Sequence, residues 1–138
     1  ASLWRHRFEG QLMPAIFNLD GTIQSLGGVL KMGLYGINRT TRGTIDYIPS
    51  ICYLMPRELW AHEAGFDPKY PGAYEDVDMG VRLGRSRLQV DPHAWVTHRS
   101  NSTLQYTPAD RWRFKKGRIR LAHKHYGSAM QALAHIAP

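Results

Sequence analysis

The chain has 138 residues, 43% of them hydrophobic, and carries 18 basic against 11 acidic residues, for a net charge of +7. Its length and hydrophobic content predict a single unit over residues 1–138 with one core. The only cysteine, Cys52, excludes an intrachain disulfide, and no apolar run approaches the roughly 20 residues that span a bilayer. We therefore expect a cytoplasmic protein in which Cys52 is a buried structural residue.

The first elements of the chain are short and mixed. Residues 13–17 are a predicted strand, which leads into a turn at residues 18–21, where Asp-Gly favours turn conformations. Residues 23–29 are expected to return as a second strand, with Gly27-Gly28 marking a bulge or a close approach. A polar, glycine-containing loop is predicted for residues 33–43.

The middle of the chain predicts a buried strand followed by helices. Residues 45–55 are rich in β-branched and aromatic residues and give the strongest strand pattern in the sequence. Helices are predicted for residues 56–64, where Pro56 takes a first-turn position, and for residues 74–84, where apolar residues recur at helical spacing. Each of these helices ends at a glycine, and short strands are expected at residues 88–90 and 94–97.

The positive charge gathers in a predicted C-terminal helical segment at about residues 107–138. Residues 1–98 hold ten basic and ten acidic residues, whereas residues 99–138 hold eight basic residues and a single acidic one. Thr107 is a predicted N-cap and Pro108 the first helical residue of a helix that continues to about Tyr126. Its apolar residues lie on two opposite faces, so we expect this helix to pack on the core and to touch something else. Its basic side chains fit either a solvated face or contact with an acidic partner.

Three carboxylates crowd residues 74–78. At the start of a helix they can cap free backbone N–H groups and interact favourably with the helix dipole, which is a purely structural interpretation. Crowded carboxylates also raise one another's pKa and can hold a base near a reacting hydroxyl. Glu75 and Asp78 share one face of the predicted helix, and Asp78 is four residues from Arg82, so Asp76 is the carboxylate most free to meet a substrate.

A second polar group follows the predicted strand at residues 94–97. His98 stands at the end of that strand, and a lone histidine is more often a surface or core residue than a metal ligand. The loop that follows begins with Arg99 and is rich in hydroxyl groups, among them Ser102. Such a loop can hold phosphate oxygens, although polar loops are common.

Five segments in this order resemble family 2 glycosyltransferases over about residues 12–103. The segments are Asn18-Leu19-Asp20-Gly21-Thr22-Ile23-Gln24-Ser25-Leu26-Gly27-Gly28, residues 48–60, Gly65-Phe66-Asp67, residues 74–83 and residues 90–98. The resemblance implies the C-terminal, acceptor-side half of an α/β GT-A fold, a mixed sheet with flanking helices. Nothing before Leu12 resembles the family's nucleotide-binding βαβ half with its DxD metal motif. We therefore expect that half to be absent from this chain, supplied by a missing N-terminal part or a homo-oligomer partner, and the chain alone to be inactive.

The resemblance also implies roles for individual residues. The family transfers a sugar, with inversion, from a nucleotide-diphosphate donor to a hydroxyl of a glycan or lipid-linked acceptor, in cell-surface polysaccharide or glycan synthesis. The residues that match its motifs are Asp76 as the catalytic base, Glu75, Asp78 and Arg82 at the acceptor site, with Asp78 and Arg82 orienting the helix, His98 as a ligand of a divalent cation (Mg or Mn), and Arg99 and Ser102 on the diphosphate loop.

The sequence leaves the role of the basic segment and the activity of the chain open. The basic residues at 107–126 are expected to contact the inner face of a membrane near a lipid-linked acceptor. An alternative is a non-catalytic module that uses these residues to bind nucleic acid or an anionic membrane, although the sequence shows no helix-turn-helix, RNA-recognition or zinc-finger pattern. A degenerate or truncated chain without activity is the third interpretation.

Overall fold

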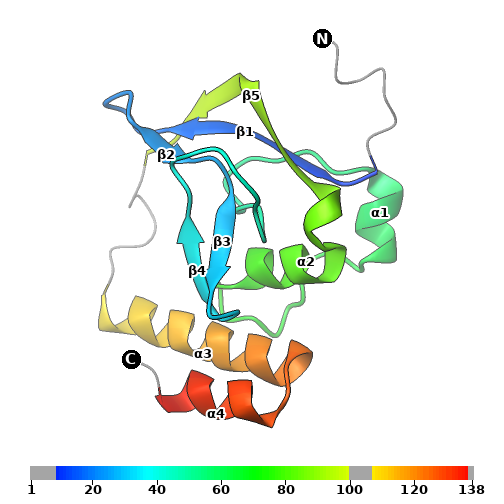
Figure 1. Cartoon of the computed structure of the whole chain (residues 1–138), viewed down its shortest axis with the longest axis vertical. Coiled ribbons are helices and arrows are strands. Elements are labelled where there is room, and N and C mark those ends of the chain that lie inside the picture. The colour runs from blue at the N-terminus through cyan, green and yellow to red at the C-terminus, as the bar shows by residue number, and fades with distance from the viewer. Residues whose placement is uncertain (1–8, 100–106, 137–138) are drawn as a thin grey trace.

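The computed structural model describes residues 9–99 and 107–136 of the chain. It is a mixed α/β structure with a three-stranded sheet of order β2-β1-β5 and a separate β3-β4 hairpin (Figure 1). The C-terminal helices α3 and α4 lie together at one end of the molecule, next to the hairpin and helix α2 (Figure 1). The expected mixed sheet with flanking helices is therefore present.

The central strand of the larger sheet is β1 (Gln11–Phe17). It pairs in parallel with β5 (Leu88–Thr97) and antiparallel with β2 (Ile23–Ser25). The two short strands predicted at residues 88–97 are one strand whose register shifts, so that Pro14 lies opposite Asp91 and the next residue lies opposite Trp95. The residues between, which include a proline unable to donate to the ladder, are skipped by the pairing.

The second hairpin corrects two predictions. The strand expected over residues 23–29 is broken at Gly27, whose φ of +92° takes the chain out of the sheet, and β3 (Gly28–Lys31) begins after it. The loop expected at residues 33–43 contains β4 (Tyr35–Asn38), which pairs antiparallel with β3. The predicted close approach is confirmed, because a Cβ on Gly28 would collide with the ring of Tyr47.

The strand predicted for residues 45–55 is wrong. This segment forms only isolated bridges, Gly28 with Tyr47 and Leu12 with Leu54, and is otherwise irregular. Its apolar residues are nevertheless in the core, since Ile48 is completely buried. The hydrophobic pattern therefore reports the burial of an irregular segment, and Pro49 is one reason that a continuous ladder does not form.

Two helices follow this irregular segment. Helix α1 (Arg57–His62) begins after Pro56, which is its N-cap and not its first residue, and the chain then turns at Gly65 with φ +66°. Helix α2 (Glu75–Leu83) ends at Gly84, as predicted, and a short 3-10 helix η2 (Arg85–Arg87) leads into β5. A Cβ on Gly80 would lie 2.5 Å from the carbonyl oxygen of Asp46, so α2 packs directly on backbone.

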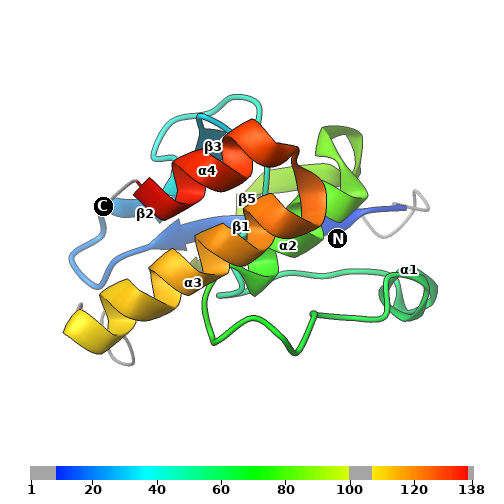
Figure 2. The same cartoon turned by 90° about the horizontal axis from the view of Figure 1, so that it is seen from below.

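The C-terminal helical segment consists of α3 (Pro108–His125) and α4 (Ser128–Ile136). Thr107 is the N-cap of α3, and it forms a reciprocal capping box with Asp110. The second contact predicted for the two-sided helix is partly α4: Leu121 faces the core, while Ile119 packs with residues of α4. Figure 2 shows the two helices side by side, with the C-terminal part of α3 in front of α2.

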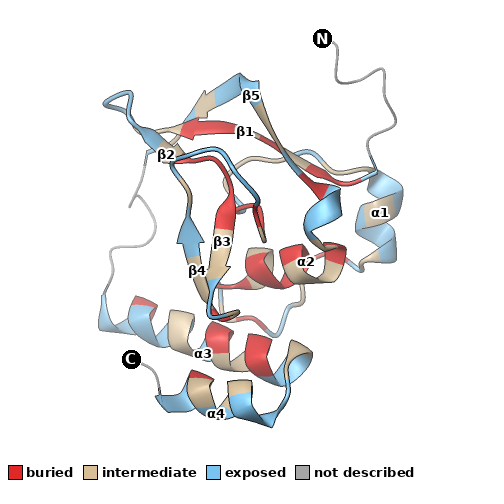
Figure 3. Ribbon diagram, in the orientation of Figure 1, coloured by how far each residue is buried: buried red, intermediate tan, exposed pale blue. Residues whose placement is uncertain are grey.

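The main core lies between the larger sheet and α2 (Figure 3). Met13, Ile16 and Met79 are completely buried there. Cys52 packs against this core but is only half-buried, so the expectation of a buried cysteine holds in part. Within the described ranges, no helix combines the length and the apolar character needed to cross a bilayer.

Candidate functional site

The first turn of α2 is fixed by Tyr74. This residue has a left-handed backbone, with φ of +75°, which is unfavourable for a bulky side chain. Its side chain is buried, and its hydroxyl donates to the carbonyl of Leu34 at 2.9 Å and accepts from the N–H of Gly36 at 3.4 Å. Contacts with the hairpin thus stabilise a strained residue immediately before the carboxylates, a situation common at functional sites.

Asp76 is half-buried, and backbone N–H groups hold its carboxylate. Ser50 N–H donates to Oδ2 at 3.1 Å, and Val77 N–H donates to Oδ1 at 2.8 Å. Burial, together with the nearby charge of Glu75, raises the pKa of Asp76 to about 6, although the two backbone hydrogen bonds act in the opposite direction. A carboxylate with such a pKa is ionised at neutral pH and still basic enough to accept a proton.

Tyrosines lie around Asp76. Burial raises the pKa of Tyr53 and of Tyr47, and the negative charge of Asp76 raises both further. Both side chains come from the irregular segment at residues 45–55, whose residue Ser50 also contacts Asp76. This segment, predicted as a strand, therefore contacts the Asp76 carboxylate, and no sequence pattern indicated that contact.

Glu75 offers an unused acceptor beside Asp76. Its Oε2 atom is buried and accepts no hydrogen bond within the described part of the chain. Buried carboxylate oxygens are normally satisfied, because leaving one without a partner costs free energy. Oε2 of Glu75 is therefore an acceptor that no described residue uses, on the residue next to Asp76.

Asp78 is fully buried and its carboxylate is surrounded by donors. The groups that donate to it are Tyr70 Oη at 3.1 Å, Arg82 Nε at 2.9 Å, Lys124 Nζ at 3.0 Å and His125 Nε2 at 2.7 Å. Burial alone would raise the pKa of Asp78, but the hydrogen bonds from His125 and Lys124 and the neighbouring positive charges lower it overall. Asp78 therefore joins α2 to α3.

Arg82 is occupied in the same way. It pairs with Asp78, and its guanidinium also donates to the carbonyls of Glu63 and Gly65, the latter at 2.8 Å. Asp78 and Arg82 were expected at the acceptor site, but their polar atoms are engaged in internal contacts. These contacts hold α2 in place, and the role expected for the two residues at the acceptor site stays a prediction.

His98 directly follows β5, so it comes from a different element than the carboxylates of α2. Its backbone N–H donates to the carbonyl of Phe17 at 2.8 Å, and its Nδ1 lies 3.1 Å from Oε1 of Gln24 on β2. No hydrogen bond or ion pair joins His98 to Asp76. Arg99 is exposed, and Ser102 lies outside the described residues.

A divalent cation finds no complete site among the described residues. None of their His, Cys, Asp and Glu side chains form a group of three or more that could hold a metal ion. His98 therefore provides a single imidazole, whereas Mg and Mn prefer several oxygen ligands. The residues described do not fit the cation on their own, so no chemical step is assigned to it.

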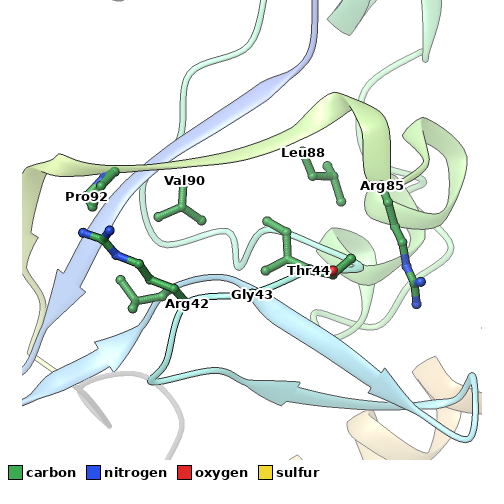
Figure 4. Close-up of a pocket in the computed structure, with 9 residues that line it drawn as sticks. Arg42, Gly43, Thr44, Arg85, Leu88, Val90 and Pro92 are labelled. Carbon is green, nitrogen blue, oxygen red and sulfur yellow. The ribbon is translucent and has the colours of Figure 1, made fainter.

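A pocket of about 350 Å³ opens between the loop that follows β4, at residues 42–45, and β5 (Figure 4). Its floor is apolar, with Leu88 and Val90, and Arg42 and Arg85 stand at opposite ends of it (Figure 4). Arg85 is paired with Asp46. None of the residues predicted for the site lines this pocket, which was not predicted from the sequence.

Much of the positive charge on α3 is used inside the protein. Arg118 is buried with its guanidinium 4.6 Å from the centre of the Tyr35 ring, and Arg120 donates to Asp67 at 2.7 Å, which lowers the pKa of Asp67. Lys116 lies over the ring of Trp112, at 5.1 Å. The basic segment is therefore partly an internal network that holds α3 on the fold.

In comparisons with known proteins, no family model matches the chain, and neither a curated protein nor a solved structure matches it.

Proposed function

We propose that these residues form the acceptor side of an inverting glycosyltransferase, which transfers a sugar from a nucleotide-diphosphate donor to a hydroxyl group. The observation that carries the proposal is Asp76, a half-buried carboxylate held by two backbone N–H groups, with a pKa raised to about 6. The same residue matches the catalytic base in the sequence resemblance. Geometry and sequence therefore support one role for it.

The proposed reaction is a single displacement. An acceptor hydroxyl gives its proton to the Asp76 carboxylate while its oxygen forms a bond to the anomeric carbon of the donor. The bond from that carbon to the diphosphate oxygen breaks on the opposite face, and its electron pair leaves with the nucleoside diphosphate. Attack and departure on opposite faces invert the configuration. General-base assistance of this kind contributes about 10²- to 10⁴-fold to the rate.

The residues near Asp76 in the sequence and His98 have separate proposed roles. The unpaired Oε2 of Glu75 is suited to accept a hydrogen bond from a second hydroxyl of the acceptor and so to orient it. Asp78 and Arg82 fix the direction of α2 through their internal contacts. His98 stays a candidate ligand for the expected Mg or Mn ion, with any further ligands coming from outside the described residues.

The first experiment tests acceptor binding, which needs no donor. Glycans of different composition are titrated into the ¹⁵N-labelled chain, and amide shifts are followed by NMR. The proposal predicts that binding glycans shift the amides of residues 74–78 and of the segment around Ser50, and that Glu75→Gln weakens this binding. Shifts confined to α3, or binding unaffected by Glu75→Gln, would count against the acceptor site.

The second experiment tests the base in the natural polypeptide that contains these 138 residues. Sugar transfer from a panel of nucleotide sugars is measured for the unaltered protein, for Asp76→Asn and for Glu58→Gln, a control that removes an exposed carboxylate from α1. Asp76→Asn is expected to lower kcat by about 10²- to 10⁴-fold with donor binding retained, and the control to have no effect. Transfer by Asp76→Asn at the unaltered rate would refute the proposed base.

A second candidate function is contact with an anionic membrane surface. It is favoured by one observation: Trp112 is 54% exposed and lies beside Arg111 and Lys115, with which it lines a shallow hollow on α3. Exposed tryptophan among cations is typical of interfacial helices. Co-sedimentation with vesicles containing phosphatidylserine is expected to fall for Trp112→Ala, and an unchanged bound fraction would exclude this contact.

A further inference from the structure

Arg39 holds the loop that forms one wall of the pocket beside β5. Its guanidinium donates through Nε to the carbonyl of Thr41 at 3.3 Å, through Nη2 to the carbonyl of Arg42 at 3.2 Å and through Nη1 to the carbonyl of Thr44 at 3.0 Å. Gly43 leaves room for this guanidinium, because a Cβ at Gly43 would lie 2.5 Å from Nη2. The wall is therefore fixed by contacts within its own loop, as is usual for pre-formed ligand pockets.

An ion pair closes the end of the pocket at η2. Asp46, the residue after this loop, accepts from Nε of Arg85 through Oδ1 and from the N–H of Leu30 through Oδ2, the latter at 2.7 Å. Figure 4 shows the guanidinium of Arg85 directed away from the pocket floor. The charge of Arg85 is thus balanced by a carboxylate of the protein, and its aliphatic stem is the part that lines the pocket.

The floor of the pocket is apolar. Leu26, Ile45 and Leu88 are buried there, whereas Val90 is half-buried and Pro92 is exposed. None of the described acidic residues is among those that line the pocket, so no carboxylate of the lining repels an anion. The volume of about 350 Å³ is at the lower end of the range found for ligand pockets. The floor therefore suits the apolar part of a small molecule.

Arg42 supplies a cation that the protein itself does not use. Within residues 9–99 and 107–136, its guanidinium forms no hydrogen bond or ion pair, in contrast to the guanidinium groups of Arg39 and Arg85. Its side chain extends from the loop in the direction of Pro92, which lines the same pocket (Figure 4). A guanidinium binds a carboxylate through two parallel N–H···O hydrogen bonds. The pocket thus combines an apolar floor with an available partner for one anionic group.

We propose that this pocket binds a small organic carboxylate, whose apolar body lies on the floor and whose carboxylate pairs with Arg42. One unpaired guanidinium balances one negative charge, which favours a carboxylate over a phosphate monoester with its charge of nearly two. The site shares no lining residue with the carboxylates of α2 and does not depend on the glycosyl transfer proposed above.

Titration of the ¹⁵N-labelled chain with hexanoate, followed by NMR, tests the site. Saturable shifts are expected for the amides of residues 42–45 and 88–91. Acetate tests the apolar body, because affinity should rise by about fourfold for each methylene group that is buried. Hexylammonium, which has the same apolar chain and the opposite charge, should not bind. Shifts that leave residues 42–45 and 88–91 unaffected, or equal affinities for hexanoate and hexylammonium, would overturn the proposal.

Variants test the role of Arg42. Arg42→Gln is expected to lower the affinity for hexanoate by about fivefold or more, since it removes a charge-assisted pair at a partly exposed site. Arg87→Gln is the matched control, because it removes an exposed arginine of η2 that does not line the pocket. It should leave the affinity unchanged. Equal losses in the two variants would show a general effect of charge, and unaltered binding in Arg42→Gln would exclude the carboxylate pair; either result refutes the site.

Discussion

The Asp76 carboxylate on α2 accepts a hydrogen bond from the backbone N–H of Ser50, at 3.1 Å, and so connects the start of the helix to the irregular segment that faces it. The bond fixes the carboxylate without neutralising it, because a backbone N–H carries no formal charge. The pKa of Asp76 is raised to about 6, because burial and the charge of Glu75 raise it by more than the backbone hydrogen bonds lower it. Because its pKa is raised, the ionised Asp76 destabilises the folded state at neutral pH, and this leads to the first prediction.

Asp76→Asn is expected to stabilise the protein at pH 7. Because the folded-state pKa of about 6 lies above the ordinary 3.8, Asp76 favours the folded state fully only below about pH 4, and this contribution is lost as the pH rises to about 6. A shift of this size corresponds to about 1–3 kcal/mol. Urea denaturation at pH 7 should show a gain of that order for the variant.

The same comparison at about pH 4 provides the control for Asp76. There the carboxyl is largely protonated in the folded protein, so the advantage of Asp76→Asn should shrink. A gain in the free energy of unfolding that is equal at both pH values, or a variant that is less stable at pH 7, would mean that the charge of Asp76 does not destabilise the folded state.

Asp78→Asn is expected to be strongly destabilising, in contrast to its neighbour. The substitution leaves Arg82, Lys124 and His125 around a buried site without the negative charge that they share. Loss of one partner of a buried ion pair typically costs about 3–5 kcal/mol. The free energy of unfolding, measured in urea, should fall by this order, while the exposed-site variant Glu58→Gln should change it by less than about 0.5 kcal/mol.

The Asp78 network also predicts the response to acid. The pKa of Asp78 is lowered below its ordinary 3.8, so its contribution to stability is complete above that value and is lost as the pH falls through the lower folded-state pKa. Near-UV circular dichroism should therefore report a cooperative loss of packing below about pH 4 that is shifted to higher pH in Lys124→Met. An unchanged midpoint in that variant would exclude Lys124 from the network.

Gly80→Ala should destabilise the protein although it improves helix propensity. In an exposed helix the change would be worth about 1 kcal/mol in favour of alanine. Here the new Cβ would lie 2.5 Å from the carbonyl oxygen of Asp46 and 2.6 Å from Cα of Tyr47, so α2 must move away from the segment that holds Ser50. We expect a net loss of about 1–3 kcal/mol.

Gly127→Ala is the matched control for Gly80. A Cβ at Gly127 meets no described atom within 4 Å, and its φ is not in the left-handed region, so the substitution should be neutral or slightly stabilising. Equal melting temperatures for the two variants would contradict the close contact between α2 and residues 46–47.

The parts of the fold that the sequence predicts correctly depend on local chemistry. Thr107 and Asp110 are spaced for a capping box, and Gly84, with its positive φ, ends α2. The start of α3 and the end of α2 are therefore each determined by residues close in the sequence. The strand predicted for residues 45–55 is wrong because these residues are apolar for burial in the core and not for pairing in a sheet. No local pattern distinguishes these two causes.

In the candidate site, too, local patterns indicate some residues and tertiary contacts determine the others. The crowded carboxylates of the sequence point to Asp76, and the helical spacing predicts the pair of Asp78 with Arg82 that the structure contains. The contribution of Ser50 and Tyr53 depends on a contact between segments 23 or more residues apart in the sequence, which helical or strand periodicity does not encode. Two of the four donors to Asp78, Lys124 and His125, come from α3, more than 40 residues away in the sequence, so this part of its internal role was visible only in the fold.

The most direct test of the account is the ionisation of Asp76 itself. Its side-chain carboxyl carbon can be followed by NMR in the ¹³C-labelled chain from pH 3 to pH 8, with Asp76→Asn used to assign the signal. The account predicts a titration midpoint of about 6. A midpoint at or below the ordinary 3.8 would contradict it, because such a carboxylate would be too weak a base to take the proton from an acceptor hydroxyl.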